Sequence, residues 1–408
     1  TLPFLTKIFS TGLFSNIWTP NSFAALANKL VTPTGSAWPS PGIKIPPKIS
    51  FSFIIGYFSF TRKAANEAAT RAADKFGLDI ENDLENFRTL HSFAFRKLGI
   101  TKEKMMGPDD YREFGIKCGI PIKTTSFSND DGTFNSDNEY LTIINTARVK
   151  RMDLLEYYDS RQNILDIERS TLYLLSEELK KFKKEKGLKD FTDLLEDFIH
   201  KEIHPSFEVL FIDEAQDLSL LQWDMVRCIW ANAKKTYIAG DDDQAIFKWA
   251  GADVDSFIAL QDQMINLPLI QSHRIPIKVH QLVMGIVNRI KHRINKTWQP
   301  KTNEGSLHRH FDIDSVDMSS GEWLVLARTK HMLKEIEDTL YRKGLYYETR
   351  HKRSYEKDIQ EAATNWEHLR QGQLLDYKQI EKIYGYMSPN HRDKTLMYGM
   401  TKGSFYGI

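Results

Sequence analysis

The chain has 408 residues, which predicts two to four domains if a domain takes about 100–200 residues. Hydrophobic residues make up 41% of the sequence and aromatic residues 12%, so the composition excludes a disordered chain and indicates packed cores. The net charge of +1 argues neither for nor against binding of nucleic acid, and any nucleic-acid-binding surface must be a local patch.

The cysteines and the apolar runs indicate in which cellular compartment the chain is expected. Cys118 and Cys228 are far apart and lack metal-ligand spacing, so we expect a chain of the reducing cytoplasm. The apolar run at residues 51–60 is too short and too rich in serine to span a bilayer, and the first residues lack the layout of a signal peptide. We therefore expect no membrane partner, and the sequence indicates no particular protein partner.

The first 50 residues differ from the rest of the chain. No Asp or Glu precedes Glu67, and 7 of the 14 prolines lie before that residue. Residues 32–50 show neither helical nor strand periodicity, which is typical of loop or disordered chain. We expect residues 1–50 to be an atypical, disordered segment, and a start at Thr1 instead of Met favours a fragment.

Order is expected to begin at residues 51–61, whose aromatic and β-branched side chains predict a buried strand. A helix should follow, because Thr61 can cap its start and Gly77 can end it. Residues 88–99 predict a turn that leads into another helix. Residues 100–200 are mostly polar, and their pattern is mostly helical.

In the next part of the chain, strands alternate with helices. Residues 207–214 and 234–244 each predict an apolar strand that ends in carboxylates, and residues 218–233 between them have an amphipathic helical pattern. A further strand at residues 322–329 precedes a helical pattern at residues 330–344. The alternation predicts an α/β fold with a parallel sheet, in which ligands bind beyond the carboxyl ends of the strands.

Two acidic clusters fall at such strand ends. Asp213 and Glu214 suit Mg²⁺, which takes one or two carboxylates and keeps several waters; the alternative is a solvated strand end with an acidic helix cap. Residues 241–243 are all Asp and precede Gln244, whose neutral amide could sense a phosphate; the alternative is an exposed acidic turn. Trp249 could stack on a nucleic-acid base or belong to the core.

Together these motifs resemble the UvrD/Rep branch of superfamily 1 helicases. The two acidic strand ends read DEAQD and GDDDQAIFKWAGA, in the family's order and with a helix between them. The resemblance extends from about residue 55 to about residue 350 through the segments YFSFTRKAANEAATRA, RTLHSFAFR, DFTDLLEDFI, LIQSHRIP and WLVLART. It implies RecA-like motor domains of the P-loop NTPase type, with parallel sheets.

The resemblance also implies roles at a site for ATP and Mg²⁺. Asp213 would hold Mg²⁺, and Glu214 would be the catalytic base that deprotonates the attacking water. Gln244 would couple the γ-phosphate to DNA contacts. Arg274 would reach the γ-phosphate as a guanidinium fork, and His273 stands where the family stacks an aromatic ring on adenine.

Other residues are implied to contact single-stranded or partly duplex DNA. Trp249 would stack on a base, while Phe60, Thr61, Arg62 and His91 would line the DNA track of the first motor domain. For Arg62 and His91 the alternative is an ordinary surface position. Asp217 is expected to be a structural acid at the start of the following helix.

Two parts of the family pattern are missing from the sequence. No Gly-Lys-Thr/Ser phosphate loop occurs near residues 32–44, where the family has it, so ATP binding should be weak. The motifs expected after about residue 350 are missing too. We favour a partial or frame-disturbed gene product; the alternatives are a degenerate paralogue that binds DNA without hydrolysing ATP, and missing parts supplied by another chain.

We therefore predict a first RecA-like domain at residues 51–265 with a helical accessory insert at 100–185, and a partial second RecA-like domain at 266–408. The predicted function is an ATP-dependent DNA helicase or translocase, of a type that serves DNA repair and replication. The first alternative is an ATPase-inactive DNA-binding protein on the same scaffold. The second is a metal-dependent nuclease, which the lack of an Asp…Glu-x-Lys set disfavours.

Two basic runs could contact phosphates, each contact adding salt-dependent affinity. They are Lys180–Lys189 and Asn288–Lys296. For the first run a solvated helix face is the preferred interpretation.

Overall fold

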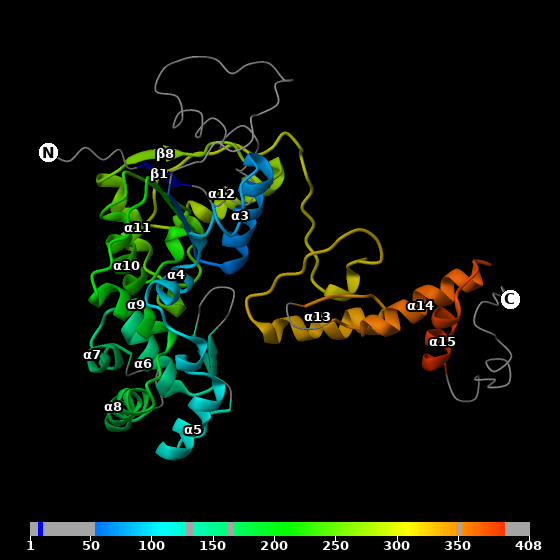
Figure 1. Ribbon diagram of the computed structural model, residues 1–408. Helices are drawn as coiled ribbons and strands as arrows, with labels where there is room; N and C mark the ends of the chain where they lie inside the picture. Colours follow the sequence, from blue (N-terminus) through cyan, green and yellow to red (C-terminus); the bar gives the residue numbers. More distant parts are fainter. Residues whose placement is uncertain are drawn as a thin grey trace. The chain divides into compact units, whose positions relative to one another are not determined.

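The computed structural model describes residues 7–10, 54–123, 125–127, 134–161, 167–349 and 353–387 (Figure 1). The chain divides into two compact units, Thr1–Ser306 and Leu307–Ile408, and the first unit carries every predicted site residue. Among the described residues, no helix is both long and apolar enough to cross a membrane.

The first unit is built on a six-stranded sheet in which neighbouring strands run parallel. The predicted α/β fold with a parallel sheet is therefore confirmed. The strand order is β3-β2-β6-β7-β1-β8. The strands are β1 (Lys7–Ser10), β2 (Ile55–Ser59), β3 (Phe87–Arg88), β6 (Val209–Asp213), β7 (Lys235–Gly240) and β8 (Ile265–Pro268).

The prediction of a disordered segment over residues 1–50 is wrong at Lys7–Ser10. This strand pairs with β7 on one side and with β8 on the other, and Ser10 lies opposite Gly240. A run of four residues is too short to show a strand period in the sequence, so its strand conformation comes from pairing with distant segments. Residues 32–50, predicted to be loop or disordered chain, lie outside the described residues.

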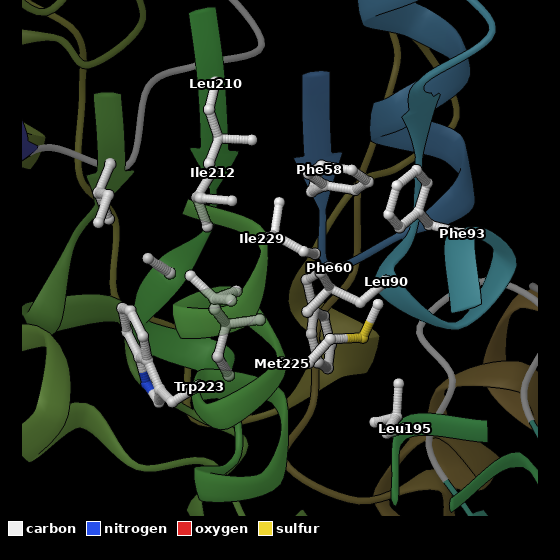
Figure 2. Packing of buried hydrophobic residues seen from close by; sticks show 14 of the residues in the cluster. Phe58, Phe60, Leu90, Phe93, Leu195, Leu210, Ile212, Trp223, Met225 and Ile229 are labelled. Carbon is white, nitrogen blue, oxygen red and sulfur yellow. The ribbon is translucent and has the colours of Figure 1, made fainter. Parts of the chain in front are cut away.

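Side chains alternate between the two faces of the sheet, and both faces are covered. Phe58, Leu210 and Ile212 point to the face that packs against α4, α9 and α10 (Figure 2). Tyr57 and Phe211 point to the opposite face and pack with small residues of α3. These helices are α3 (Arg62–Phe76), α4 (Leu90–Lys97), α9 (Phe191–His200) and α10 (Leu220–Trp230).

The helix boundaries follow the capping residues. Thr61 accepts a hydrogen bond from the Ala64 N–H at 3.1 Å and starts α3, and Gly77 ends that helix with a φ of 65°, so both predicted caps are confirmed. Thr89 caps α4 in the same way. Ser219 starts α10 through a reciprocal capping box.

The helices between α4 and α9 have a core of their own. Phe114, Leu141 and Leu172 are among its buried residues. The segment also contains an antiparallel pair of short strands, β4 (Thr125–Phe127) and β5 (Phe134–Ser136). The helices are α5 (Pro108–Cys118), α6 (Glu139–Val149), α7 (Leu154–Asp159) and α8 (Arg169–Lys186). Their role as an accessory insert over residues 100–185 stays a prediction.

The first unit extends beyond the predicted domain boundary at residue 266. Ile294 is 1% exposed and belongs to the core that covers the sheet, and Lys296 pairs with carboxylates that follow β7. These contacts tie residues 266–306 to the sheet, so the compact division falls after Ser306. This part of the unit also contains α12 (Ile277–Val287), and α11 (Val254–Ala259) precedes β8.

The second unit is helical in its described residues, 307–349 and 353–387, which form no strand. The strand predicted at 322–329 is therefore wrong, while the partial second RecA-like domain at 266–408 stays a prediction. Leu324 and Leu326 are 83% and 81% exposed, because the sheet against which an apolar strand would pack is not formed in these residues. The helices are α13 (Lys330–Arg342), confirming the helix predicted after 330, α14 (Lys357–Arg370) and α15 (Tyr377–Tyr386).

Candidate nucleotide and DNA site

Three strand ends meet at one edge of the sheet. Ser59 lies opposite Asp213 where β2 pairs with β6, and β7 ends next to them at Gly240. Because these strands are parallel, the segments that follow them all begin at this edge. The two acidic clusters, which are 27 residues apart in numbering from Glu214 to Asp241, therefore lie side by side.

Asp213 is buried at the end of β6. Its Oδ2 accepts a hydrogen bond from the Tyr57 hydroxyl, and its Oδ1 accepts one from the Glu214 N–H at 3.0 Å. Burial, followed by the nearby Glu214 carboxylate, raises the pKa of Asp213 to about 7, against the effect of the two hydrogen bonds. Burial and Asp213 also raise the pKa of Tyr57, so the phenol remains a donor to this carboxylate.

Glu214 follows with a left-handed backbone, at φ 53° and ψ 42°. A residue other than glycine in this conformation costs on the order of 1–3 kcal/mol, and such strain persists only where the surroundings fix it. Gln216 supplies one such contact, because its Nε2 donates to Glu214 Oε2 at 2.9 Å. The same amide accepts the Asp241 N–H on its Oε1 at 3.0 Å, so Gln216 joins the two acidic clusters.

Asp217 lies two residues before the N-cap of the following helix but does not cap it, and its role as a structural acid stays a prediction. Ser219 is the N-cap of α10, while Asp217 lies in the 3-10 helix η2 (Ala215–Asp217) and is 8% exposed. Its Oδ1 has no hydrogen-bond partner among the described residues. Burial, followed by Glu214, raises the pKa of Asp217 to about 7.

The three aspartates after β7 are neither an exposed turn nor free to hold a metal. Lys296, itself 5% exposed, places its Nζ 2.7 Å from Asp241 Oδ1 and 3.0 Å from Asp243 Oδ2, and it also pairs with Asp242. Arg293 forms two hydrogen bonds of 2.7 Å with the Asp243 carboxylate. The basic run Asn288–Lys296 could contact phosphates by its sequence, but two of its cations, Arg293 and Lys296, form ion pairs inside the protein.

Phe60 and His91 share a pocket beside the acidic edge. Phe60 is 8% exposed and its ring lies 5.1 Å from that of Phe247, which also lines the pocket together with Asp217 (Figure 2 shows Phe60 next to the core). Burial lowers the pKa of His91 to about 4, so its imidazole is neutral at physiological pH. Trp249 is 64% exposed and lies 6.3 Å from the Phe247 ring, which excludes the core alternative for this side chain.

The other predicted site residues are more peripheral. The Thr61 hydroxyl is engaged in capping α3, and Arg62 is exposed at the first position of that helix. Gln244 is exposed in the 3-10 helix η3 (Asp242–Gln244), and its Nε2 donates to Asp241 Oδ2 at 2.6 Å. His273 and Arg274 lie exposed in the loop after β8.

An ion network joins the helical segment to α9, which covers the sheet next to this pocket. Arg148 of α6 contacts Asp190 at 2.7 Å, Asp193 at 2.6 Å and Glu196 at 2.7 Å. Lys183 of α8 adds contacts of 2.7 and 2.8 Å to the two aspartates and is 8% exposed. A fully solvated face for the run Lys180–Lys189 is therefore wrong at Lys183.

Sequence reasoning missed four residues that shape the site. Gln216 and Phe247 lie inside the quoted motifs, and their spacing beside the acids and Trp249 could have indicated them. Tyr57 could have been found from the strand period, because it stands two residues before Ser59 on the same face. Lys296 carries no such signal, since its partners are more than fifty residues away in the sequence.

The donors at the acidic edge fit a hard divalent cation. Asp213 and Glu214 offer carboxylate oxygens, and the buried Ser59 Oγ opposite Asp213 has no hydrogen-bond partner among the described residues. Oxygen donors of this kind suit Mg²⁺. Asp241, Asp242 and Asp243 fit less well, because Lys296 and Arg293 already pair with them and compensate two of their three negative charges.

The sequence of the chain is similar to those of known proteins. A sequence model of the UvrD/REP helicase N-terminal domain matches residues 48–265. An ATP-dependent DNA helicase PcrA of Leuconostoc citreum is 23% identical over 367 residues, which cover 83% of this chain and 46% of the relative. An ATP-dependent DNA helicase Rep of Buchnera aphidicola is 21% identical over 308 residues (70% and 43%), and a probable DNA helicase II homolog of Rickettsia felis is 28% identical over 268 (59% and 38%). The chain thus spans less than half of the length of these relatives, and it belongs to the UvrD/REP helicase family.

Proposed function

We propose that the chain is part of an ATP-dependent motor that moves on, or unwinds, DNA in the cytoplasm, in the service of DNA repair or replication. The observation that carries this proposal is the convergence at one sheet edge of Asp213 and Glu214 with the turn that holds Gln244 and leads to Trp249. A nucleotide-responsive group and a DNA-binding group are thereby connected through a few hydrogen bonds.

In the proposed site, Asp213 and Ser59 would hold Mg²⁺, with ATP as the substrate. The metal ion would neutralise charge that develops on the phosphates. Glu214 would accept the proton of the attacking water, since its carboxylate is half-buried and fixed by Gln216. Gln244 and Arg274 would report on the γ-phosphate from their exposed positions, and His273 would lie against the base.

For DNA, Trp249 is the anchor that the geometry supports best. Its exposed ring can stack on a base of single-stranded DNA, worth about 1–3 kcal/mol. Phe60 and His91 line the pocket behind it, and neutral His91 offers a hydrogen bond without charge. Thr61 and Arg62 stand at the start of α3, where the exposed guanidinium can contact a phosphate.

The test compares ATP hydrolysis with and without single-stranded DNA for the wild type and Glu214→Gln. We expect DNA-stimulated hydrolysis that the substitution reduces by at least about 100-fold, as for loss of a general base. Glu208→Gln is the matched control, because Glu208 lies before the other end of β6 and pairs with exposed Lys234. Hydrolysis that survives Glu214→Gln would refute the assigned role.

A second function is an ATPase-inactive DNA-binding protein on the same scaffold. The sequence feature that favours it is the lack of a Gly-Lys-Thr/Ser loop in residues 1–50. It predicts that DNA binding depends on Trp249 while no ATP is hydrolysed by any variant. The nuclease alternative gains little from residues 241–243, because Lys296 and Arg293 compensate two of their three negative charges.

A further inference from the structure

Gln216 is a fully buried polar side chain between the two acidic clusters, with an exposure of 1%. Its Nε2 donates to Glu214 Oε2 at 2.9 Å and, at 3.4 Å, to Asp217 Oδ2. Its Oε1 accepts the Asp241 N–H at 3.0 Å. The two ends of one amide thus hold a carboxylate on one side and a backbone group on the other, so neither end can move without disturbing the other.

The hydrogen bonds continue beyond Asp241 into the turn that follows β7. Asp241 Oδ2 accepts from Gln244 Nε2 at 2.6 Å, and its Oδ1 accepts from the Asp243 N–H at 3.2 Å. The turn leads within a few residues to the 3-10 helix η4 (Lys248–Ala250), which carries Trp249. A contiguous path therefore runs from Glu214 through Gln216 and Asp241 to this turn.

The position of the Gln216 amide is enforced by its surroundings. A Cβ added at Gly240 would lie only 2.6 Å from Gln216 Oε1 and 3.0 Å from the Phe257 ring. Glycine at the end of β7 is thus what allows the amide to reach the backbone of Asp241. The left-handed backbone of Glu214 is likewise held in place while its carboxylate bonds Gln216.

We propose that Gln216 is a positioning residue that couples Glu214 to the turn Asp241–Gln244 and so to Trp249. The proposal deepens the proposed function, on which its catalytic consequence rests. A Glu214 carboxylate that turns toward a water releases one donor of the Gln216 amide. The amide is then free to shift toward Asp217, and the bond to the Asp241 N–H changes with it.

The coupling is tested first without nucleotide, by hydrogen exchange of residues 241–250 in a double-mutant cycle. The four proteins are the wild type, Glu214→Ala, Gln216→Met and the double variant. We expect Glu214→Ala to speed exchange in this turn by about threefold to tenfold when Gln216 is present, and to have no further effect in the Gln216→Met background. An equal effect of Glu214→Ala in both backgrounds would overturn the proposal.

A further variant guards against simple misfolding. Gly240→Ala pushes the unaltered amide away and should reproduce the Gln216→Met result. If Glu214→Ala speeds exchange of the turn in the Gly240→Ala background as much as in the wild type, the coupling does not run through the Gln216 amide.

The catalytic consequence is read as the ratio of ATP hydrolysis rates with and without single-stranded DNA. Gln216→Met should lower this ratio by about tenfold, whereas a merely structural role would lower the melting temperature and leave the ratio unchanged. If the wild type hydrolyses no ATP, the proposed function is refuted but the coupling is not. The hydrogen-exchange cycle still decides whether Gln216 couples Glu214 to the turn Asp241–Gln244.

Discussion

Replacing Lys296 with methionine should destabilise the first unit strongly, because this buried lysine pairs with three buried or partly buried aspartates. Its ammonium lies 2.7 Å from Asp241 and 3.0 Å from Asp243 and also pairs with Asp242, while its side chain is only 2% exposed. Methionine fills a similar volume but leaves the carboxylates without this cation. The substitution therefore removes charge with little loss of packing.

The size of the expected destabilisation depends on which hydrogen-bond partners the three aspartates keep after Lys296 is replaced. Asp243 keeps both hydrogen bonds to Arg293, and Asp242 keeps the Ile294 N–H at 2.6 Å. The uncompensated charge therefore falls mainly on Asp241 and Asp242. Removing one partner of a buried ion pair costs about 3–5 kcal/mol, so we expect the free energy of unfolding to fall by about that amount at pH 7.

Urea unfolding followed by circular dichroism measures this loss, with Lys234→Met as the matched control. The Lys234–Glu208 pair has a similar distance of 2.6 Å, but the lysine is 70% exposed, so its loss should cost no more than about 1 kcal/mol. Adding Asp242→Asn to Lys296→Met should restore part of the stability, because the amide removes one buried charge. A cost for Lys296→Met no larger than the control, or no rescue, would refute the reasoning.

Three further predictions concern acids, the helical segment and DNA. Asp217→Asn should raise stability at pH 8 by up to about 4 kcal/mol and leave it unchanged near pH 4. The folded chain keeps a proton on Asp217 up to about pH 7, whereas the unfolded chain loses it above about pH 4. The stability of the wild type therefore falls as the pH rises from about 4 to about 7, and urea midpoints at pH 4 and pH 8 measure the difference. Arg148→Met should cost about 3–5 kcal/mol in urea unfolding, and Arg169→Met, whose pair is about half exposed, less than about 1 kcal/mol. Trp249→Ala should weaken single-stranded DNA binding in an anisotropy titration by about 1–3 kcal/mol without changing the melting temperature, and a large fall in melting temperature would contradict its exposed position.

Local signals in the sequence were enough to predict many of the helices and strands of the first unit. Thr61 and Gly77 mark the ends of α3 because a hydroxyl cap and a left-handed glycine act within a few residues. The apolar runs before Asp213 and Gly240 predict buried parallel strands, since both faces of the sheet are covered. The meeting of the two acidic clusters follows from the same topology, because parallel strands end at one edge.

Partners that are distant in the sequence could not be predicted. Lys296 looks like any other cation of a basic run, and only the folded chain shows that it lies among the aspartates after β7. Lys7–Ser10 is a strand because β7 and β8 are available on either side of it. Residues 322–329 show the opposite case, because their sequence has a strand pattern but they form no strand. A strand also needs a neighbouring strand to pair with, and the pattern of one segment does not provide it.

The two acidic clusters look alike in the sequence but differ in how far nearby lysines and arginines compensate their charge. The three aspartates after β7 already pair with Lys296 and Arg293, so an added cation would meet only one uncompensated negative charge. Among the described residues, no lysine or arginine pairs with Asp213 or Asp217, and burial raises the pKa of both to about 7. A divalent cation that bound at this edge would replace those protons, and its binding energy would be largest where the charge is least compensated. In the proposed function, the carboxylates after β6 are therefore the place where nucleotide and metal would change the molecule. The cluster after β7, held by Lys296 and Arg293, would be the rigid support against which Gln216 transmits that change.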